Sequence, residues 1–474
     1  MQADGWKVSL LYRRHVREEQ QSPRTAELAA RLGVVGDVTE HVDGGCLHAP
    51  PALYRFDGRG RHIARIAQQG WFDLVLCSVW FWNEPSPAFA EIALPLIRSH
   101  SPQHRQPYVG LLIDDAHAIR AKRLAVWESD PIVRREYEQQ ATSLEPRLRS
   151  IYSLADMILH VSASDQAAER SSDFASTITP PLNWQLLRTP LKTMRSTSTV
   201  IRRRASPPTA VRIGFLGNGQ TATNHQGVQW FLIHCWAALR QRFPKIRLRL
   251  VGRKPGVVYN SSGVYECKHG AGSSRCGWAW GTPFEGREKE NGIDELSFLN
   301  QEGMLYEAMS WRGMVAPIRA TTGINTKLLV SLELGVPLMV TTAAAAPLNL
   351  GLYSNRSTGA ALLADEPTEF IAACSKLLSS DHAWRTHSKA ALEAYQRMEA
   401  EDPAASDMRK LLSAACDGGH GGRWAAMMEQ QQAHPTPQQT SSSLSVDASI
   451  FDSIPSLDKL CEVVDDVAQG CAAR

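Results

Sequence analysis

An alternation of short apolar runs with helix-length segments constrains this chain more than any other feature, because it recurs in both halves of the sequence. Strands that are apolar along their whole length belong to parallel sheets covered by helices on both faces. The alternation therefore predicts an α/β protein with two parallel sheets. The predicted strands are Trp6–Tyr12, Phe72–Val79, Tyr108–Ile113, Met157–Val161, Val211–Leu216, Ile246–Val251, Met314–Ile318 and Val336–Val340.

Shifts in composition divide the chain into segments. Residues 188–210 are basic, rich in Ser and Thr, and contain two consecutive prolines, which predicts a surface linker. The linker separates an N-terminal domain, residues 1–187, from a second domain, residues 211–400, which a crossover helix over 401–418 follows. Residues 419–474 include the low-complexity run QQQAHPTPQQTSSSLS and are predicted to form a disordered tail.

Charge, apolar content and cysteine number limit which partners, compartments and metal sites we expect. The net charge of +3 is too balanced to indicate a nucleic-acid partner. No apolar run reaches the ~18 residues that a membrane span needs, so only peripheral membrane contact stays open. The nine cysteines are scattered, which predicts a reducing compartment, the cytoplasm or an organelle stroma. Cys267, His269 and Cys276 match no zinc-binding spacing, so we expect no metal site.

The stretch ATTGINTKLLVSLELGVPLMVT predicts a turn, a helix and a strand. Its apolar positions recur at helical spacing: Ile324, Leu328, Leu329 and Leu332. Gly335 ends the predicted helix. The first turn of a helix carries unpaired N–H groups and a partial positive charge, so the start at Gly323–Lys327 predicts a site for an anion.

A strand, loop, helix and strand follow one another between Val211 and Pro255. The loop carries Gly217, Asn218 and Gly219 at the carboxyl end of the first strand, which is the edge where open parallel sheets bind ligands. Small residues at this place allow a phosphate or a sugar to approach the backbone.

Both segments resemble the C-terminal half of glycosyltransferases with the two-Rossmann-domain fold (GT-B), particularly the retaining family 4 type. The matching residues are Asn224, Gly227, Val228, Trp230, Phe231, Phe243, Pro244, Leu248, Leu250, Val251, Gly252, Pro317, Ile318, Arg319, Thr322–Lys327, Leu329, Gly335, Val336, Pro337 and Thr341. In the first half, Ile113–Arg123 and Ala155–Asp165 are similar to two N-terminal segments of that family.

The resemblance implies two facing Rossmann-like domains and transfer of a sugar from a nucleotide-sugar donor. It implies retention at the anomeric carbon, no metal and no cofactor beyond the donor. The acceptor, whether glycan, lipid or small molecule, would bind the N-terminal domain, with Asp115 and His117 as catalytic candidates. The expected donor-binding residues are Gly217, Asn218, Gly219, Arg253, Arg319, Thr322, Gly323, Ile324, Asn325, Thr326, Lys327 and Glu333.

Several of these candidate residues also have a purely structural interpretation. Asp115 would cap the next helix and leave His117 an ordinary first-turn residue. Asn224 is expected to be a helix N-cap. Trp278 and Trp280 fit core packing as well as stacking on a sugar or base. Arg319 and Lys327 fit solvated or ion-paired surface positions.

The chain departs from the family at two positions that usually hold glutamates. Thr322 and Val330 stand there, and neither accepts hydrogen bonds as a carboxylate does. In the family, one of these glutamates accepts hydrogen bonds from the ribose of the donor. Glu333 lies nearly one turn after Val330 and is one candidate to replace this acceptor. A residue of the loop over 253–292 is the other candidate. A non-catalytic pseudo-glycosyltransferase and a different enzyme on the same fold, such as a sugar epimerase, are the alternatives.

The start of the chain raises a further expectation. The strand in GWKVSLLY matches the second strand of the family fold, so we expect the central first strand to be absent from the sequence. We expect either that Val8–Tyr12 pairs directly with Leu74–Val79, or that a gap separates them. Either arrangement would suggest a truncated gene model or a fragment.

Overall fold

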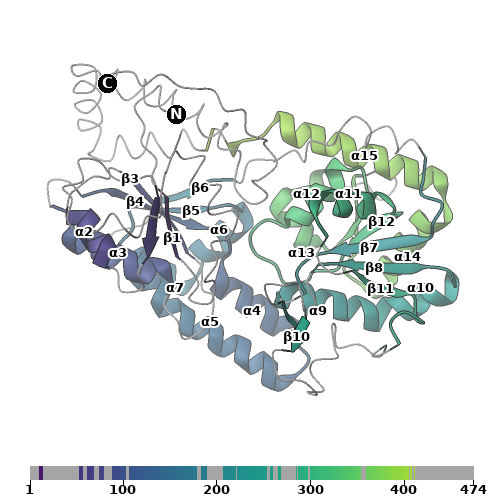
Figure 1. The fold of residues 1–474 in the computed structure, drawn as a ribbon, viewed down its shortest axis with the longest axis horizontal. Coiled ribbons are helices and arrows are strands. Elements are labelled where there is room, and N and C mark those ends of the chain that lie inside the picture. The colour runs from purple at the N-terminus through teal and green to yellow at the C-terminus, as the bar shows by residue number, and fades with distance from the viewer. Residues whose placement is uncertain are drawn as a thin grey trace.

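Two α/β units lie side by side in the computed structural model (Figure 1). Each is built on a parallel sheet, so the predicted fold class is confirmed. The structure describes residues 10–13, 53–56, 61–68, 74–79, 88–102, 106–178, 183–188, 206–219, 221–252, 257–259, 265–267, 284, 287–296, 299–353, 359–404, 406–407 and 410.

The N-terminal unit carries a four-stranded sheet in the order β3–β4–β5–β6, with all neighbours parallel. The strands are β3 (Leu74–Ser78), β4 (Tyr108–Ile113), β5 (Met157–His160) and β6 (Asn183–Leu186). The helices are α2 (Arg61–Gln68), α3 (Phe89–His100), α4 (His117–Trp127), α5 (Pro131–Tyr152), α6 (Ala163–Arg170) and α7 (Asp173–Ser176). Buried apolar side chains from the strands and from α3, α4 and α5 form its core.

The first described strand pairs elsewhere than with β3. Strand β1 (Leu10–Arg13) forms a separate parallel pair with β2 (Leu53–Phe56). Among the described strands no ladder joins β1 to β3, so the expected direct pairing of Val8–Tyr12 with Leu74–Val79 is not found. The lack of a central strand stays a prediction, because residues 14–52 lie outside the described part of the chain.

The C-terminal unit carries a six-stranded parallel sheet in the order β11–β8–β7–β12–β13–β14. The strands are β7 (Arg212–Leu216), β8 (Arg247–Val251), β11 (Ile293–Leu296), β12 (Gly313–Ala316), β13 (Leu338–Val340) and β14 (Ala361–Leu363). In chain order this is the 3-2-1-4-5-6 arrangement of a doubly wound sheet. The direction of winding reverses between β7 and β12, and ligands bind doubly wound sheets in the crevice at such a switch point.

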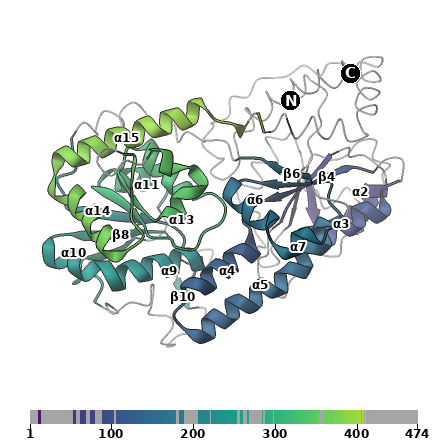
Figure 2. The same cartoon turned by 180° about the vertical axis from the view of Figure 1, so that it is seen from behind.

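Helices cover both faces of this sheet (Figures 1 and 2). They are α9 (Ala222–Phe231), the π-helical turn η4 (Leu232–Trp236), α10 (Ala237–Arg242), α11 (Gln301–Met309), α12 (Thr326–Glu333), α13 (Thr342–Ala345), the 3₁₀ turns η5 (Ala346–Leu348) and η6 (Leu350–Tyr353), α14 (Pro367–Ser379) and α15 (Asp381–Ala400). Strands β9 (Val257–Tyr259) and β10 (Tyr265–Cys267) form a separate antiparallel pair. Among the described helices, none has the length and apolar character that crossing a membrane requires.

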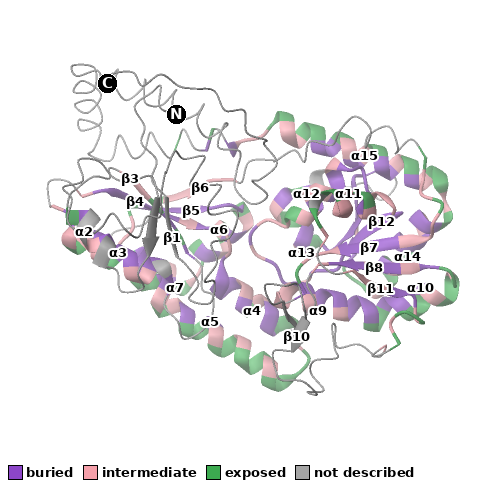
Figure 3. Ribbon diagram, viewed as in Figure 1, coloured by how far each residue is buried: buried purple, intermediate pink, exposed green. Residues whose placement is uncertain are grey.

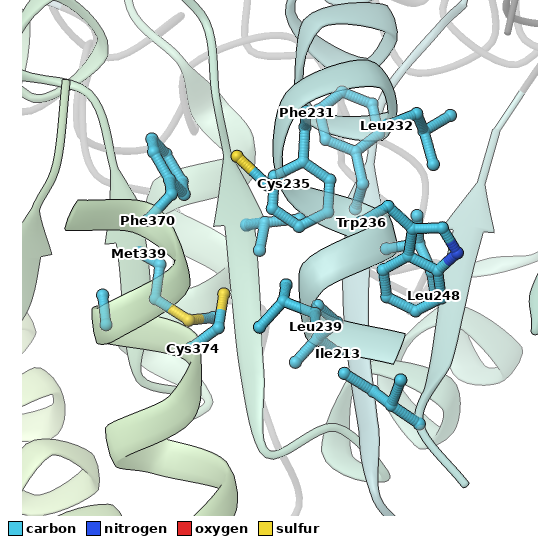
Figure 4. Packing of buried hydrophobic residues seen from close by; sticks show 14 of the residues in the cluster. Ile213, Phe231, Leu232, Cys235, Trp236, Leu239, Leu248, Met339, Phe370 and Cys374 are labelled. Atoms are coloured by element: carbon cyan, nitrogen blue, oxygen red, sulfur yellow. The ribbon is translucent and has the colours of Figure 1, made fainter. Parts of the chain in front are cut away.

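Apolar packing on both faces holds the C-terminal sheet in place. One cluster joins the sheet to α9, η4, α10 and α14, and Figure 4 shows Phe231, Trp236 and Phe370 among its side chains. A second cluster joins the other face to α11, α12 and α15. Between them, strands β12 and β13 are buried along their whole length, and β7, β8 and β14 along most of theirs (Figure 3). The rigid sheet therefore fixes the positions of the loops at its carboxyl edge.

An ion pair between the buried Asp407 and the partly exposed Arg188 brings the end of the described chain back to the N-terminal unit. Asp407 accepts hydrogen bonds from Nε and Nη2 of Arg188 at 2.8 and 2.9 Å. Arg188 follows β6, so the segment after α15 is tied beside the exit of the N-terminal sheet. The expected tail over 419–474 lies outside the described residues, as does linker segment 189–205, and the domain boundaries stay predictions.

Close packing at Gly214 gives a test of the C-terminal core. A Cβ atom there would collide with the ring of the fully buried Trp311. We expect Gly214→Ala to lower the free energy of unfolding by about 1–3 kcal/mol, the usual cost of overpacking a core. Urea denaturation measures this change. Gly351→Ala is the control, because a Cβ there meets no atom within 4 Å; equal midpoints for both variants would contradict the packing.

Candidate functional site

The loop between β12 and α12 lies at the switch point and contacts the N-terminal unit. Gly323 in this loop has φ of +66°, a left-handed conformation that glycine adopts without steric cost. A Cβ atom there would also collide with the backbone carbonyl of Asp114, which follows β4. Gly323 therefore allows the two units to approach each other at backbone distance.

An anion does lie at this loop, and it belongs to the chain itself. The backbone N–H of Gly323 donates to Oδ2 of Asp165 at 2.6 Å. Asp165 lies in the first turn of α6 and is 2% exposed. Oδ1 of the same carboxylate accepts from Arg123 at 3.0 Å, and the Arg123 guanidinium also donates to the carbonyl of Thr321. Burial raises the pKa of Asp165, while the Gly323 N–H and Arg123 oppose that rise.

A second carboxylate of the N-terminal unit meets the same loop. The hydroxyl of Thr322 donates to Oδ1 of Asp115, and Asp115 forms an ion pair with Arg120. The N-cap of α4 is Ala116, with no side-chain cap bond, so the capping role considered for Asp115 is wrong. Asp115 instead directs its charge toward Arg120 and the loop. Burial, together with the neighbouring Asp115, raises the pKa of Asp114 to about 6.

His117 lies beside this pair in the first turn of α4 and is 5% exposed. Its Nδ1 is 3.0 Å from Nη2 of Arg120. A guanidinium has only donors, so Nδ1 is the acceptor and the ring proton resides on Nε2. Burial lowers the pKa of His117 to about 4. At neutral pH the imidazole is therefore uncharged and acts through hydrogen bonds.

Lys327 projects from the first turn of α12 toward the end of β7. Its Nζ donates to Oδ1 of Asn224 at 2.7 Å and lies 5.4 Å from the centre of the Phe215 ring. The residue as a whole is partly exposed, whereas its ammonium group is enclosed, and burial lowers its pKa to about 7. The amide of Asn224 also donates to the carbonyl of Asn218 at 2.9 Å. The Gly217–Gly219 loop is thereby joined to the start of α12.

Asn224 has a different position from the one expected. The N-cap of α9 is Thr221, and Asn224 is the third residue of the helix. Its buried side chain bridges Lys327 and Asn218 instead of capping the helix. The expectation of a helix N-cap at Asn224 is therefore wrong, because the helix begins one turn earlier.

Arg319 joins the two units through aromatic rings. Its guanidinium carbon lies 4.6 Å from the ring centre of Trp127 on α4 and 5.1 Å from that of Trp230 on α9. Its Nε is buried and has no hydrogen-bond acceptor among the described residues. Burial lowers the pKa of Arg319, and the charges of Glu128 and Glu366 oppose this. A cation held between two rings is positioned without a carboxylate that would neutralise it.

Of the other expected site residues, three lie at the start of α12 and Glu333 lies at its far end. Asn325 is the N-cap of α12 and donates to Thr321 Oγ1 at 3.1 Å, Thr326 is the first residue of that helix, and Ile324 packs against the core beneath it. Glu333 is the last residue of α12, about 10 Å along the axis from Thr326. Its charge, after burial, contributes to the raised pKa of Tyr395 on α15. Arg253, Trp278 and Trp280 lie outside the described residues.

Sequence reasoning missed the role of two residues at the centre of the contact. Asp165 stands at the end of a segment that matched the family, and Arg123 at the end of another, yet neither was singled out. The available signal was the Ser162–Asp165 pair, in which Ser162 caps α6 and accepts from the Asp165 backbone N–H. That pattern predicts a helix start, but it does not predict which element the Asp165 carboxylate faces.

Comparisons with known proteins identify distant structural likenesses. No protein-family model and no curated protein sequence matches the chain. Sucrose-phosphate synthase from Thermosynechococcus elongatus is similar with a TM-score of 0.49 and 14% identity over 78% of this chain and 83% of that one. Anabaena HepE in complex with UDP has a TM-score of 0.48 and 14% identity, over 77% and 86% of the two chains. These likenesses are too distant to assign an activity.

The buried Lys327 ammonium generates a pH test. Its folded-state pKa of about 7 lies below the unfolded value of about 10.4, so the unfolded chain binds more protons between these values. The stability of the unmodified protein relative to Lys327→Met should therefore rise with pH across this window, by at most about 1.4 kcal/mol per pH unit. Urea midpoints at pH 6 to 10 measure the difference.

The exposed Lys389 on α15 supplies the control for this test. The Lys389 side chain is 79% exposed, so we expect Lys389→Met to shift stability by the same small amount at every pH in the series. Parallel stability profiles for Lys327→Met and the unmodified protein would show that the ammonium is solvated.

Proposed function

We propose that this protein is a glycosyltransferase that moves a sugar from a nucleotide-sugar donor to an acceptor, with retention and without a metal ion. One observation carries the proposal. The loop before α12 and the Gly217–Gly219 loop meet at the switch point of a doubly wound sheet, with Lys327 and Arg319 beside them. This combination of backbone donors and cations suits a diphosphate.

The chemistry follows from where charge develops. When the bond between sugar and diphosphate breaks, negative charge accumulates on the leaving phosphate. The Gly323 N–H and the Lys327 ammonium lie at the start of α12, and Arg319 approaches from the end of β12. Lys327 is preorganised by its 2.7 Å hydrogen bond to Asn224, and Arg319 by its two rings. Groups that are fixed before the reaction stabilise this charge without reorganising.

The N-terminal unit supplies the facing wall. Asp114 and Asp115 follow β4 and lie against the loop before α12, and His117 lies beside Arg120 in the first turn of α4. A neutral His117 presents an Nε2–H donor, which suits a hydrogen bond to an acceptor or to the transferred sugar. The acceptor would accordingly enter from this side. Its chemical class, glycan, lipid or small molecule, is left to experiment.

A non-catalytic pseudo-glycosyltransferase is the alternative, and one observation favours it. Thr322 stands where the family usually has glutamate, and its hydroxyl donates a hydrogen bond to Asp115 of the other unit. Val330 occupies the second glutamate position and supplies no polar group. A protein that only binds would keep the two-domain contact and would not turn over a donor.

Calorimetry with a panel of nucleotide sugars tests the proposal. We expect one donor class to bind the unmodified chain, and Lys327→Met to weaken that donor about tenfold or more, because a charge-assisted contact to phosphate is lost. Lys389→Met, on the exposed face of α15, should leave the affinity unchanged. A chain that binds no nucleotide sugar or nucleoside diphosphate contradicts the proposal, and binding without turnover selects the pseudo-enzyme.

The role proposed for Glu333 has its own test. If its carboxylate replaces the ribose acceptor, Glu333→Gln should weaken donor binding by about 1–3 kcal/mol, as expected for a lost charged hydrogen bond. Glu393→Gln on the exposed face of α15 is the matched control. An unchanged affinity would show that Glu333 acts only near Tyr395.

A further inference from the structure

We propose that the Asp165 carboxylate is a tethered competitor for the anion that the loop before α12 binds. The N-terminal unit would then block the donor site in the ligand-free protein and must release it before a phosphate-bearing ligand enters. The inference rests on the proposed function, since it presupposes that this loop receives a phosphate. It adds an autoinhibitory contact between the two units.

The contacts of Asp165 are those that a bound phosphate oxygen would make. One oxygen accepts from a backbone N–H at 2.6 Å, and the other accepts from an arginine at 3.0 Å. Both donors gain charge-assisted hydrogen bonds, which are among the stronger polar contacts in proteins. A second anion at Gly323 would place like charges in one buried position, so phosphate and the Asp165 carboxylate exclude each other.

The contact also holds the two units together. Asp165 belongs to the N-terminal unit and Gly323 to the C-terminal one, while Arg123 contacts both Asp165 and the Thr321 carbonyl. The backbone carbonyl of Asp114 lies against Gly323 with no space for a Cβ. A ligand at Gly323 therefore requires the units to separate at this point. Ligand binding and the internal contact are thus two states of one equilibrium.

The chain offers a matched control at Asp156. This carboxylate also accepts from one backbone N–H, that of Val109 at 2.7 Å, and from one arginine, Arg98 at 2.7 Å. All three residues belong to the N-terminal unit, so removing this carboxylate loses the same kinds of bond without affecting the contact between units.

The experiment measures binding of inorganic pyrophosphate and of UDP to the full chain by calorimetry. We expect Asp165→Ala to bind the probes on the order of tenfold more tightly than the unmodified protein, because the competing carboxylate is gone. Asp156→Asn should bind as the unmodified protein does. Small-angle scattering without ligand should show a larger radius of gyration for Asp165→Ala and no change for Asp156→Asn.

The outcomes separate this inference from the proposed function. Equal, measurable affinities for Asp165→Ala and the unmodified protein overturn the inference and leave the proposed function standing. Measurable binding to both proteins, tighter for Asp165→Ala, supports the inference. The absence of probe binding in every variant overturns both. Should Asp165→Ala fail to fold, Asp165→Asn keeps the side-chain shape and the same direction of change, and an affinity no higher than that of the unmodified protein overturns the inference.

Discussion

The hydrogen bond between the Gly323 N–H and the Asp165 carboxylate is the contact on which the arrangement of this protein depends. It joins the two α/β units at the switch point of the C-terminal sheet. Arg123 and the backbone of Asp114 complete the contact from the N-terminal unit. A buried carboxylate requires compensating donors, and here the other unit supplies one of them. A change in the relative position of the two units therefore changes the geometry of the site.

Two cations beside this contact are held without a carboxylate partner among the hydrogen bonds described for them. Lys327 donates a hydrogen bond to the amide oxygen of Asn224, and the Arg319 guanidinium lies between the rings of Trp127 and Trp230. A cation paired with a protein carboxylate has its charge largely neutralised, whereas a cation held by amides and rings keeps it available for an incoming anion. Burial lowers the pKa of both groups, because it makes the charged form less favourable.

The pattern of apolar residues in the sequence predicted much of the fold. The apolar runs predicted seven strands of the two sheets to within a few residues, because a strand buried on two faces must be apolar throughout. Strands β6, β11 and β14 were not predicted. The helix expected to follow an N-cap at Asn224 is a continuous helical run over Ala222–Arg242 that includes a π turn. Its start was misjudged because Thr221 and Asn224 are both good N-cap residue types, and local sequence does not decide between them.

The sequence by itself determined the two α/β units, the glycine loop after β7 and an anion-binding start before α12, since these depend on spacing and on local backbone chemistry. The sequence also showed that Thr322 and Val330 stand where the family usually has glutamates. Only the tertiary structure decided which anion lies at Gly323, and that Arg319 lies between rings from two units. Asp165 and Gly323 are 158 positions apart in the chain. Trp127 and Trp230, the two rings at Arg319, come from different units. Contacts between such distant residues arise from how the sheets and helices pack, and local periodicity contains no information about them.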